Sequence, residues 1–346
     1  MTAAPLEVFE AGPGDRDAWS AFTSSSPDRE AGHLWEFHDL LHRLFRQTSV
    51  RLVARRGTTW LGVLPLVRQD SLAGRFLTSV PYLNYAGVLG VDPEARHALA
   101  ERAVVLANTF RADRLEVRGR DGSDLPIPCW EGKACYELEL PTDLEALSAR
   151  LGSKLRAQIK RPSKDGYTAR TANGEGRRAF YPLLARRWHE LGSPVLPESF
   201  FEQMEDLFRK DLDYVLVEKD GRAAAAGVLL HVGSRIEIPW AASAAEHDRF
   251  GVNMLLYWMS LQRGIEREAR CFDFGRSTPA SGNARFKLQW GAVERPLRWN
   301  VHVRAARGHA AERGDSRRGW VASAWRRLPL FVANRLGPAL AKRIPY

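Results

Sequence analysis

The chain has 346 residues, of which 45% are hydrophobic, and it carries a formal net charge of +10. This length suggests two domains of roughly 150 residues each, and the hydrophobic content excludes a chain that is disordered throughout. No charge-free stretch is both long and apolar enough to match the about 20 residues of a membrane-spanning helix, and residues 1–15 lack the features of a secretion signal. Three cysteines are too few for a disulfide framework, so we expect a cytoplasmic protein.

The positive charge is concentrated at the C-terminus. Residues 301–346 hold ten basic and two acidic side chains, a net charge of +8, which leaves +2 for the first 300 residues. We therefore expect a nearly neutral body and a basic, aromatic tail over residues 306–346.

The first half of the chain predicts an α/β unit. An apolar segment at 6–9 precedes a helix at 34–45, where apolar residues recur at helical spacing. Extended segments at 50–54 and 60–67 flank a glycine turn and predict a hairpin. The remaining elements are a strand and loop at 77–89, a helix at 93–111, and strands at 114–118 and 134–140.

The second half repeats this plan. Helices are predicted at 143–159, 180–191, 198–210 and 253–268, and strands at 167–171, 213–218, 223–232, 235–242 and 271–274. Each half reads helix, hairpin, strand, helix, strand, which indicates a duplicated unit with a mixed central sheet flanked by helices. The fold class is therefore α/β (α+β), with domains at 1–142 and 143–305.

Several residues of the second half could carry chemistry. Gly251 and Asn253 open a predicted helix, where glycine allows close backbone approach and free N–H groups favour a phosphate or carboxylate; an ordinary capped helix is the alternative. Arg276 follows a strand and can hold a carboxylate or phosphate through two parallel hydrogen bonds. Asp273 and Glu237 are candidates for a general base, with a structural or solvated role as the alternative.

Taken in order, these pieces resemble the FemAB-related branch of the GNAT-like acyltransferases, in particular the FemAB-related proteins associated with the exosortase/PEP-CTERM system. The resemblance spans approximately residues 6–345, and its strongest block is 272–292. The matching residues are Gly251-x-Asn253, Phe272-Asp273-Phe274-Gly275, Phe286-Lys287-x-x-Trp290-Gly291-Ala292, Lys154-Leu155-Arg156-x-x-Ile159-Lys160-Arg161, Gly192-Ser193-Pro194-Val195, Ser79-Val80-Pro81-x-x-Asn84-Tyr85, and His33 with Trp35.

The resemblance implies two tandem GNAT-like domains and transfer of an acyl or aminoacyl group to an amine. By analogy with Fem transferases, Phe286 and Lys287 lie beside the reacting carbonyl, where a cation stabilises a developing oxyanion; Asp273 joins them as a catalytic candidate. Donor or substrate binding falls to Gly251, Asn253, Arg276, Lys154, Arg156, Asn84 and Tyr85. For the two α-helical cations, Lys154 and Arg156, a solvated helix face is the alternative.

The same resemblance frames the substrates. The donor is aminoacyl-tRNA or acyl-CoA, used as a co-substrate rather than as a tightly bound cofactor. The acceptor is a small-molecule, glycopeptide or glycan-linked amine of cell-envelope or exopolysaccharide biosynthesis. Peptidoglycan transferases carry an aspartate shortly after a Gly-Pro, whereas residues 85–90 contain no carboxylate, so a peptidoglycan acceptor is not assigned. A non-catalytic scaffold that binds a polysaccharide-assembly partner or a membrane surface is the alternative function.

Two further features have structural alternatives. His38 and His42 are spaced as in metalloprotease helices, but the required glutamate and third ligand are missing, so no metal site is expected. In the tail, aromatic residues near one helical face accompany arginines, with Pro329 and Pro338 predicted to break the helix. Residues 315–346 therefore suit an anionic membrane surface, a tRNA, or simple packing on the body.

Overall fold

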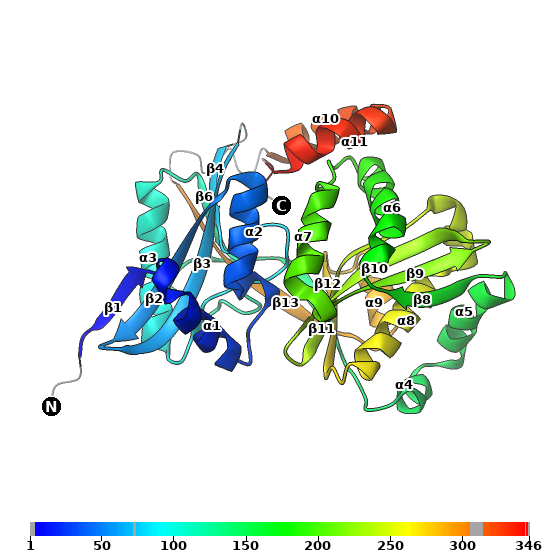
Figure 1. Ribbon diagram of the computed structural model, residues 1–346, viewed down its shortest axis with the longest axis horizontal. Coiled ribbons are helices and arrows are strands. Elements are labelled where there is room, and N and C mark those ends of the chain that lie inside the picture. The colour runs from blue at the N-terminus through cyan, green and yellow to red at the C-terminus, as the bar shows by residue number, and fades with distance from the viewer. Residues whose placement is uncertain (1–3, 72–73, 305–313, 343, 345–346) are drawn as a thin grey trace. The chain divides into compact units, whose positions relative to one another are not determined.

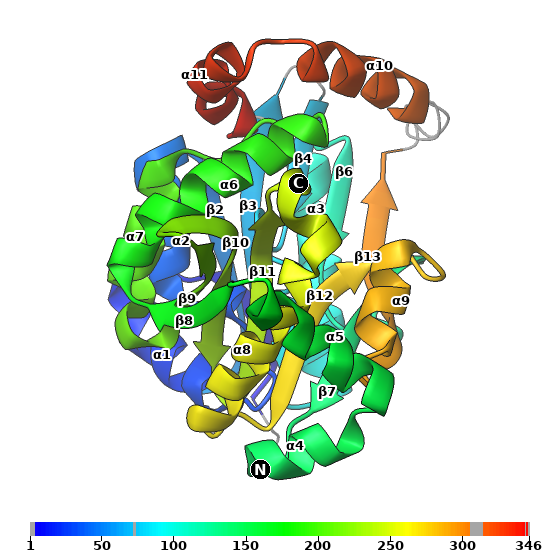
Figure 2. The same ribbon diagram turned by 90° about the vertical axis from the view of Figure 1, so that its right-hand side faces the viewer.

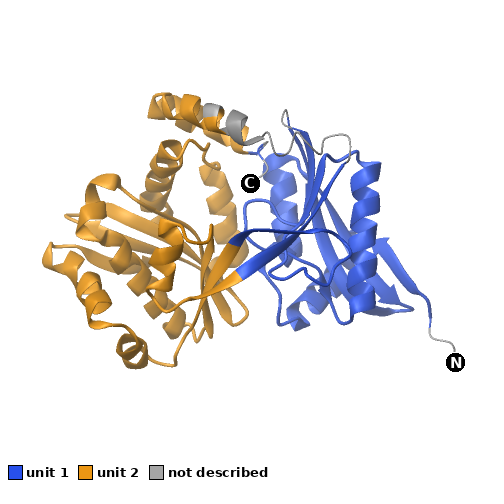
Figure 3. Cartoon of the chain, turned by 180° about the vertical axis from the view of Figure 1, so that it is seen from behind, with its two compact units in different colours: residues 1–133, 296–315, 342–346 blue, residues 134–295, 316–341 orange. Residues whose placement is uncertain are grey.

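The computed structural model describes residues 4–71, 74–304, 314–342 and 344, and they divide into two compact units (Figure 3). Unit 1 comprises Met1–Lys133, Pro296–Asp315 and Lys342–Tyr346, and unit 2 comprises Ala134–Arg295 and Ser316–Ala341. The division therefore differs from the predicted one at 142/143, because residues 134–142 belong to unit 2 and residues 296–304 belong to unit 1.

Unit 1 contains a mixed sheet with helices on both faces (Figure 1). Its strand order is β1 (Leu6–Glu10), β2 (Thr48–Arg56), β3 (Thr59–Ser71), β4 (Gly74–Thr78), β6 (Arg114–Val117) and the end of β13 (Val293–Val303), while β5 (Leu89–Gly90) pairs with β3. Strands β1 to β4 are antiparallel neighbours, and β4 and β6 are parallel. Helix α3 (Pro93–Thr109) makes the crossover that a parallel pair needs.

Alternating residues of β2 and β3 face two separate cores. Leu52 and Leu64 lie in a core with Leu99 of α3, whereas Val53 and Val63 lie in a second core. That second core includes aromatic side chains from α1 (Arg16–Ser25) and α2 (Trp35–Phe45). Because both faces of these strands are buried at their centres, residues 52–54 of β2 and 60–67 of β3 are continuously apolar.

Unit 2 repeats the arrangement. Its strand order is the end of β7 (Cys129–Glu139), β12 (Cys271–Ser277), β11 (Arg235–Ser243), β10 (Arg222–Val232), β9 (Leu212–Lys219) and β8 (Thr168–Ala172). Only β11 and β12 are parallel, and α8 (Val252–Glu266) connects them. Helix α8 packs with α5 (Ser153–Lys164), near α4 (Leu144–Arg150), while α6 (Arg177–Glu190) and α7 (Glu198–Phe208) pack around Trp240 through an aromatic cluster.

The remaining elements are short or terminal. They are α9 (Gly282–Leu288), α10 (Gly314–Arg326), α11 (Leu330–Ala341), and the 3₁₀ turns η1 (Pro13–Asp15), η2 (Ala31–His33), η3 (Gly174–Gly176), η4 (Arg209–Asp211) and η5 (Ala245–Phe250). Among the described residues, no helix is both long and apolar enough to cross a bilayer.

The two units exchange their last strands along the chain. Residues 134–139 of β7 come from the first half of the sequence but pair with β12 in unit 2. Residues 300–303 of β13 come from the second half but pair with β6 in unit 1. Each sheet is therefore completed by a strand from the other half, which is why a single cut in the sequence does not separate the units.

Three local predictions differ from the structure. The helix predicted at 143–159 is two helices, α4 and α5, because Gly152 is extended and buried Leu151 anchors the break. Helix α1 was not predicted, although Trp19 and Thr23 mark its buried face. In the tail, the chain breaks at Pro329 as predicted, but Pro338 lies inside α11. The predicted tail residues 306–313 lie outside the described residues.

Asn300 attaches β13 to unit 1, and Gly122 makes room for it. The Asn300 side chain is fully buried, and its Nδ2 donates hydrogen bonds to the carbonyls of Gly122 (2.8 Å) and Ile127 (2.9 Å). A Cβ atom at position 122 would lie only 1.9 Å from Asn300 Oδ1.

We expect Gly122→Ala to lower the free energy of unfolding by about 1–3 kcal/mol, because an added methyl group overpacks a buried site. Urea unfolding measures the change. Gly14→Ala is the matched control, since nothing lies within 4 Å of its added Cβ. Equal unfolding midpoints for the two variants would contradict this account of β13 docking.

Candidate active site

A bulge in β12 is the central feature of unit 2. The register of β12 against β7 shifts between Asp273 and Arg276, and Gly275 within this step has a positive φ of 73°. The backbone N–H of Gly275 donates a 2.7 Å hydrogen bond to Asp273 Oδ1. Glycine is needed here because a side chain disfavours this conformation, and such a bulge bends the strand.

Strands β11 and β12 separate next to this bulge. Their parallel pairing covers only Arg235–Glu237 and Cys271–Asp273, whereas β11 continues to Ser243 with β10 as its partner. The carboxyl-terminal parts of two adjacent parallel strands therefore diverge, and α8 begins beyond them (Figure 2). In α/β sheets, ligands bind beyond the carboxyl ends of parallel strands, where neighbouring connections part.

Lys287, on helix α9, stabilises the bulge. Helix α9 is capped by Ser281, and it buries Ala284 and Lys287 on one face. Lys287 Nζ donates hydrogen bonds to the carbonyls of Gly275 (2.8 Å) and Arg276 (3.2 Å), and the side chain is only 6% exposed. Burial lowers the pKa of Lys287 to about 8, while the carboxylate of Asp273 opposes that shift. A lysine that merely decorates the surface is thereby excluded.

Phe286 belongs to an aromatic layer between α8, α9 and β12. Its ring meets Tyr257 edge-on at 4.9 Å, Tyr257 stacks on Phe274 at 5.5 Å, and Trp290 lies 6.3 Å from Phe286. Burial raises the pKa of Tyr257 to about 12, so its phenol is neutral. The pairing predicted from the Phe286-Lys287 sequence thus places one side chain in this layer and the other at the bulge.

Three carboxylates form a row across the sheet. Asp273 on β12 is in register with Glu237 on β11 and with Glu137 on β7. Residues in register on neighbouring strands point to the same face and are close neighbours. Asp273 is fully buried and Glu237 is 7% exposed, so both predicted base candidates lie in this row.

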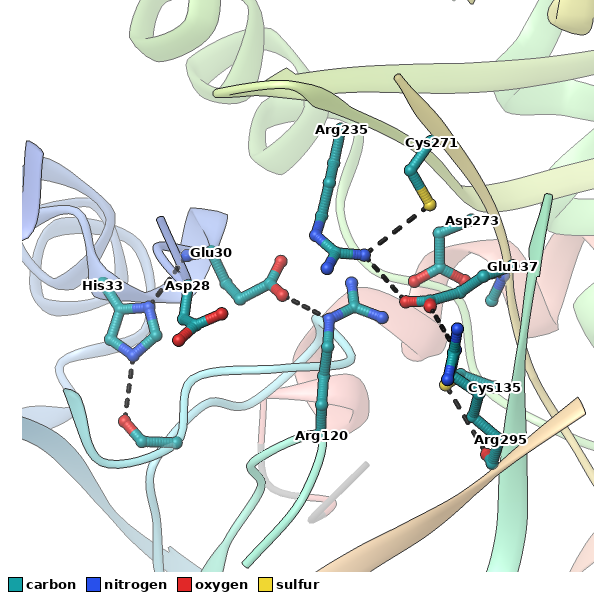
Figure 4. A network of polar contacts seen from close by, with 12 residues as sticks. Asp28, Glu30, His33, Arg120, Cys135, Glu137, Arg235, Cys271, Asp273 and Arg295 are labelled. Atoms are coloured by element: carbon teal, nitrogen blue, oxygen red, sulfur yellow. Dashed lines mark hydrogen bonds and ion pairs between the residues drawn. The ribbon is translucent and has the colours of Figure 1, made fainter. Parts of the chain in front are cut away.

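Arginines neutralise one end of the row (Figure 4). Glu137 accepts from Arg235 at 2.8 Å and from Arg295 at 2.9 Å, and the Arg235 guanidinium also contacts Cys271. Among the described residues, no group of His, Cys, Asp and Glu side chains is arranged to hold a metal ion. Glu137 was missed at the sequence level because nothing in the sequence shows which sheet its strand joins.

The start of α8 carries the predicted donor-binding residues Gly251 and Asn253. Gly251 adopts a left-handed conformation with φ of 77°, as its place at the helix start requires. Asn253 Nδ2 donates to Ser243 Oγ at 3.1 Å, and this hydroxyl donates to Asp248 Oδ1 at 2.6 Å. The amide of Asn253 therefore ties the end of β11 to α8, and an acidic side chain lies beside the helix start.

The other predicted binding residues lie in different places. Arg276 sits at the bulge with a half-buried side chain, and its carbonyl receives Lys287. Lys154 is exposed on α5. Arg156 donates to the carbonyls of Ser148 (3.2 Å) and Leu151 (2.5 Å), so its guanidinium caps α4. We therefore leave Arg156 out of the proposed site.

Asn84 and Tyr85 belong to unit 1, beside residues that the sequence did not single out. Tyr85 is buried beneath the guanidinium of Arg120 at 3.9 Å, and Arg120 donates to Glu30 at 2.5 Å (Figure 4). The Glu30 N–H donates to His33 Nδ1, so His33 Nε2 donates to the Gly87 carbonyl. Burial lowers the pKa of His33 to about 4. Unit 1 thus gathers a predicted tyrosine and histidine around one ion pair.

The two histidines that are spaced as in metalloproteases stabilise the packing of α2. His38 contacts the Gly32 carbonyl through Nε2 and Ser49 Oγ through Nδ1, and His42 contacts the Gln47 carbonyl. Burial lowers the pKa of His38 to about 3. These contacts account for the spacing through packing of α2 on β2.

Comparison with known proteins gives a family for the central segment. Residues 150–288, which run from the end of α4 to the end of α9, match the family model described as an acetyltransferase (GNAT) domain. A search of curated proteins gave no match.

Solved structures extend the likeness to nearly the whole chain. FemX has a TM-score of 0.64 at 17% identity, with 88% of this chain and 99% of that one covered. The C-terminal domain of a candidate lysylphosphatidylglycerol synthetase from Agrobacterium fabrum has a TM-score of 0.56 at 15% identity, with 87% and 96% covered. A tandem GNAT protein from the clavulanic acid biosynthesis pathway has 0.53 at 14%, with 86% and 98% covered.

At these identities the likeness is one of fold. The chain has two tandem GNAT-like units, so the predicted fold class is confirmed. The bulged strand β12, the crossover helix α8 and the lysine helix α9 all lie inside the matched segment.

The lowered pKa of Lys287 predicts a specific pH effect. Between pH 8 and 10.5 the unfolded chain keeps the lysine proton that the folded chain has released, so stability rises with pH in this window. We expect the free energy of unfolding of the wild type to rise from pH 8 to 10 relative to Lys287→Met. Urea unfolding at a series of pH values measures this difference. Exposed Lys154→Met is the control and should run parallel to the wild type. If Lys287→Met also runs parallel, the lowered pKa of Lys287 is refuted.

Proposed function

We propose that this protein is an acyltransferase that moves an acyl or aminoacyl group from an activated donor to an amine. The observation that carries the proposal is the diverging β11–β12 pair with its two carboxylates, Asp273 and Glu237, inside the segment that matches a GNAT acetyltransferase domain. The donor carbonyl lies where these two strands part. The nitrogen of the neutral amine attacks this carbonyl carbon and gives up a proton to a base, the C–O or C–S bond to the donor breaks, and the leaving oxygen or sulfur takes up a proton.

Asp273, with Glu237 in register beside it, takes the role of general base. A row of carboxylates attracts an ammonium acceptor and accepts its proton, and a positioned base of this kind contributes about 10²–10⁴-fold to the rate. Their burial strengthens the interaction with a cationic acceptor, because screening by water is weak there.

Lys287 takes a positioning role in this proposal. Its ammonium is engaged with the carbonyls of Gly275 and Arg276, and it fixes the bulge that separates the strands. Phe286 anchors α9 through the aromatic layer, which supports Lys287 in turn. The positive charge also favours negative charge that develops on the carbonyl oxygen nearby.

Both donor classes predicted from the sequence, aminoacyl-tRNA and acyl-CoA, are carried forward. Gly251, Arg276 and Lys154 are the proposed donor contacts, at the start of α8, at the bulge and on α5. The proposed acceptor is a small-molecule, glycopeptide- or glycan-linked amine of cell-envelope or exopolysaccharide biosynthesis, as the resemblance seen in the sequence implies. The assignment of Asn84 and Tyr85, in unit 1, to substrate binding stays a prediction from the sequence.

Incubation of the purified protein with labelled acyl-CoA or aminoacyl-tRNA and a panel of amines tests the activity. Amine-dependent consumption of one donor supports the proposal and identifies the donor class. If neither donor is consumed with any amine, the non-catalytic scaffold becomes the better account.

We expect Asp273→Asn to lower kcat/KM by about 10²–10⁴-fold, because the carboxamide cannot accept the amine proton. Its Oδ1 can still receive the Gly275 N–H, so the bulge is retained. Steady-state kinetics and unfolding measurements on the same samples check both statements. Glu139→Gln, an exposed carboxylate on β7, is the matched control. Wild-type turnover in Asp273→Asn would remove this residue from the mechanism.

A further inference from the structure

The C-terminal helices pack on unit 2 with one side. Trp325 is 8% exposed, Ala333 2% and Ala341 fully buried. His189 Nε2 donates to the Leu328 carbonyl at 2.9 Å, and Gly337 lies against Val195. Figure 2 shows α11 beside α6, with which it is in contact. Residues 322–341 are therefore part of unit 2. For the side of the helices that faces unit 2, this favours packing on the body over binding to a membrane or to tRNA.

The other sides of these helices present large apolar side chains to solvent. The exposed ones are Val321 (58%), Leu330 (38%), Phe331 (76%), Leu336 (46%) and Leu340 (42%). Of the twelve residues of α11, only Asn334 and Arg335 are polar. A helix that is apolar nearly all round is normally buried on all sides, so four exposed large apolar residues on α11 indicate a surface that is covered by something else.

The charge of the C-terminal segment indicates which kind of partner would cover these exposed apolar side chains. Residues 316–346 contain seven basic side chains and no acidic one. Arg326 at the end of α10, Arg327 in the turn that follows and Arg335 on α11 are exposed. Exposed apolar side chains together with a uniformly positive charge match a bilayer interface, where acyl chains and anionic headgroups lie next to each other.

We propose that α10 and α11 bind peripherally to an anionic lipid bilayer. The tail surface consists of the five exposed apolar residues with the three exposed arginines. Helix α11 has twelve residues, or about 18 Å at 1.5 Å per residue, so it lies in the plane of the interface with its apolar side chains among the acyl chains. A second copy of the chain would bring two positive segments together, and a nucleic acid would leave Phe331 and the leucines uncovered.

Sedimentation with vesicles of phosphatidylcholine, with and without phosphatidylglycerol, tests the proposal on the full chain. We expect partition onto the anionic vesicles that falls as salt is added. Replacing Phe331, Leu336 and Leu340 by serine should abolish it. The triple variant R326E/R327E/R335E should weaken it by about a hundredfold or more, since each basic residue near the surface contributes about 1 kcal/mol.

The controls carry matched changes elsewhere. V91S/V105S replaces exposed apolar residues of unit 1, and R102E/R222E reverses exposed arginines outside the tail; both should bind vesicles as the wild type does. All variants act on exposed positions, and circular dichroism checks that they fold.

Three outcomes overturn the proposal: no partition onto anionic vesicles, equal partition without phosphatidylglycerol, or binding that survives both tail variants. Self-association that the serine variant abolishes, without vesicle binding, would assign the surface to a second copy instead. Binding of tRNA that the arginine variant abolishes, without vesicle binding, would assign it to nucleic acid. Acyl transfer in solution is measured separately, so failure here does not bear on the proposed activity.

Discussion

The bulge at Asp273–Arg276 is the constraint on which the rest of unit 2 depends. Gly275 supplies the backbone conformation, Asp273 accepts a hydrogen bond from its N–H, and the buried ammonium of Lys287 donates to the carbonyls of Gly275 and Arg276. Without the bulge, we expect β12 to continue alongside β11 as an ordinary parallel neighbour, so that the two strands would not diverge before α8. Burial destabilises the charged form of Lys287, as its lowered pKa shows. Hydrogen bonds from the ammonium to two backbone carbonyls, which would otherwise be unsatisfied, offset this penalty.

The exchange of strands between the two halves has a chemical consequence. Because β7 completes the sheet of unit 2, Glu137 from the first half of the sequence enters register with Asp273 from the second half. Its carboxylate collects Arg235 and Arg295, which keep an acidic row tolerable inside the fold. The candidate site is thus made by two distant segments of the chain. The second half of the sequence alone would lack one member of the carboxylate row, Glu137.

The neutral body and the basic tail correspond to the two proposed roles, acyl transfer and membrane binding. The body is nearly neutral, and most of the excess of basic over acidic residues lies beyond β13, in a segment whose helices expose large apolar side chains. A tail that packs on unit 2 through small residues and Trp325, and exposes Phe331 and leucines, separates the surface that would meet a membrane from the interior site. Anchoring of this kind would hold the protein at a membrane surface without a spanning helix.

The sequence by itself determined the local elements and the chemistry-bearing motif. Apolar periodicity located most helices and strands, and glycine with asparagine, aspartate and lysine marked 251–287, because propensity and residue type act over a few neighbours. Only the tertiary structure decided that β7 and β13 change sheets, that Arg156 caps α4, and that Lys287 is buried against carbonyls. Strand partners are chosen by non-local hydrogen bonding and burial, which leave no mark on the strand's own residues, and so Glu137, Arg235 and Arg295 could not be connected to Asp273 before the fold was known.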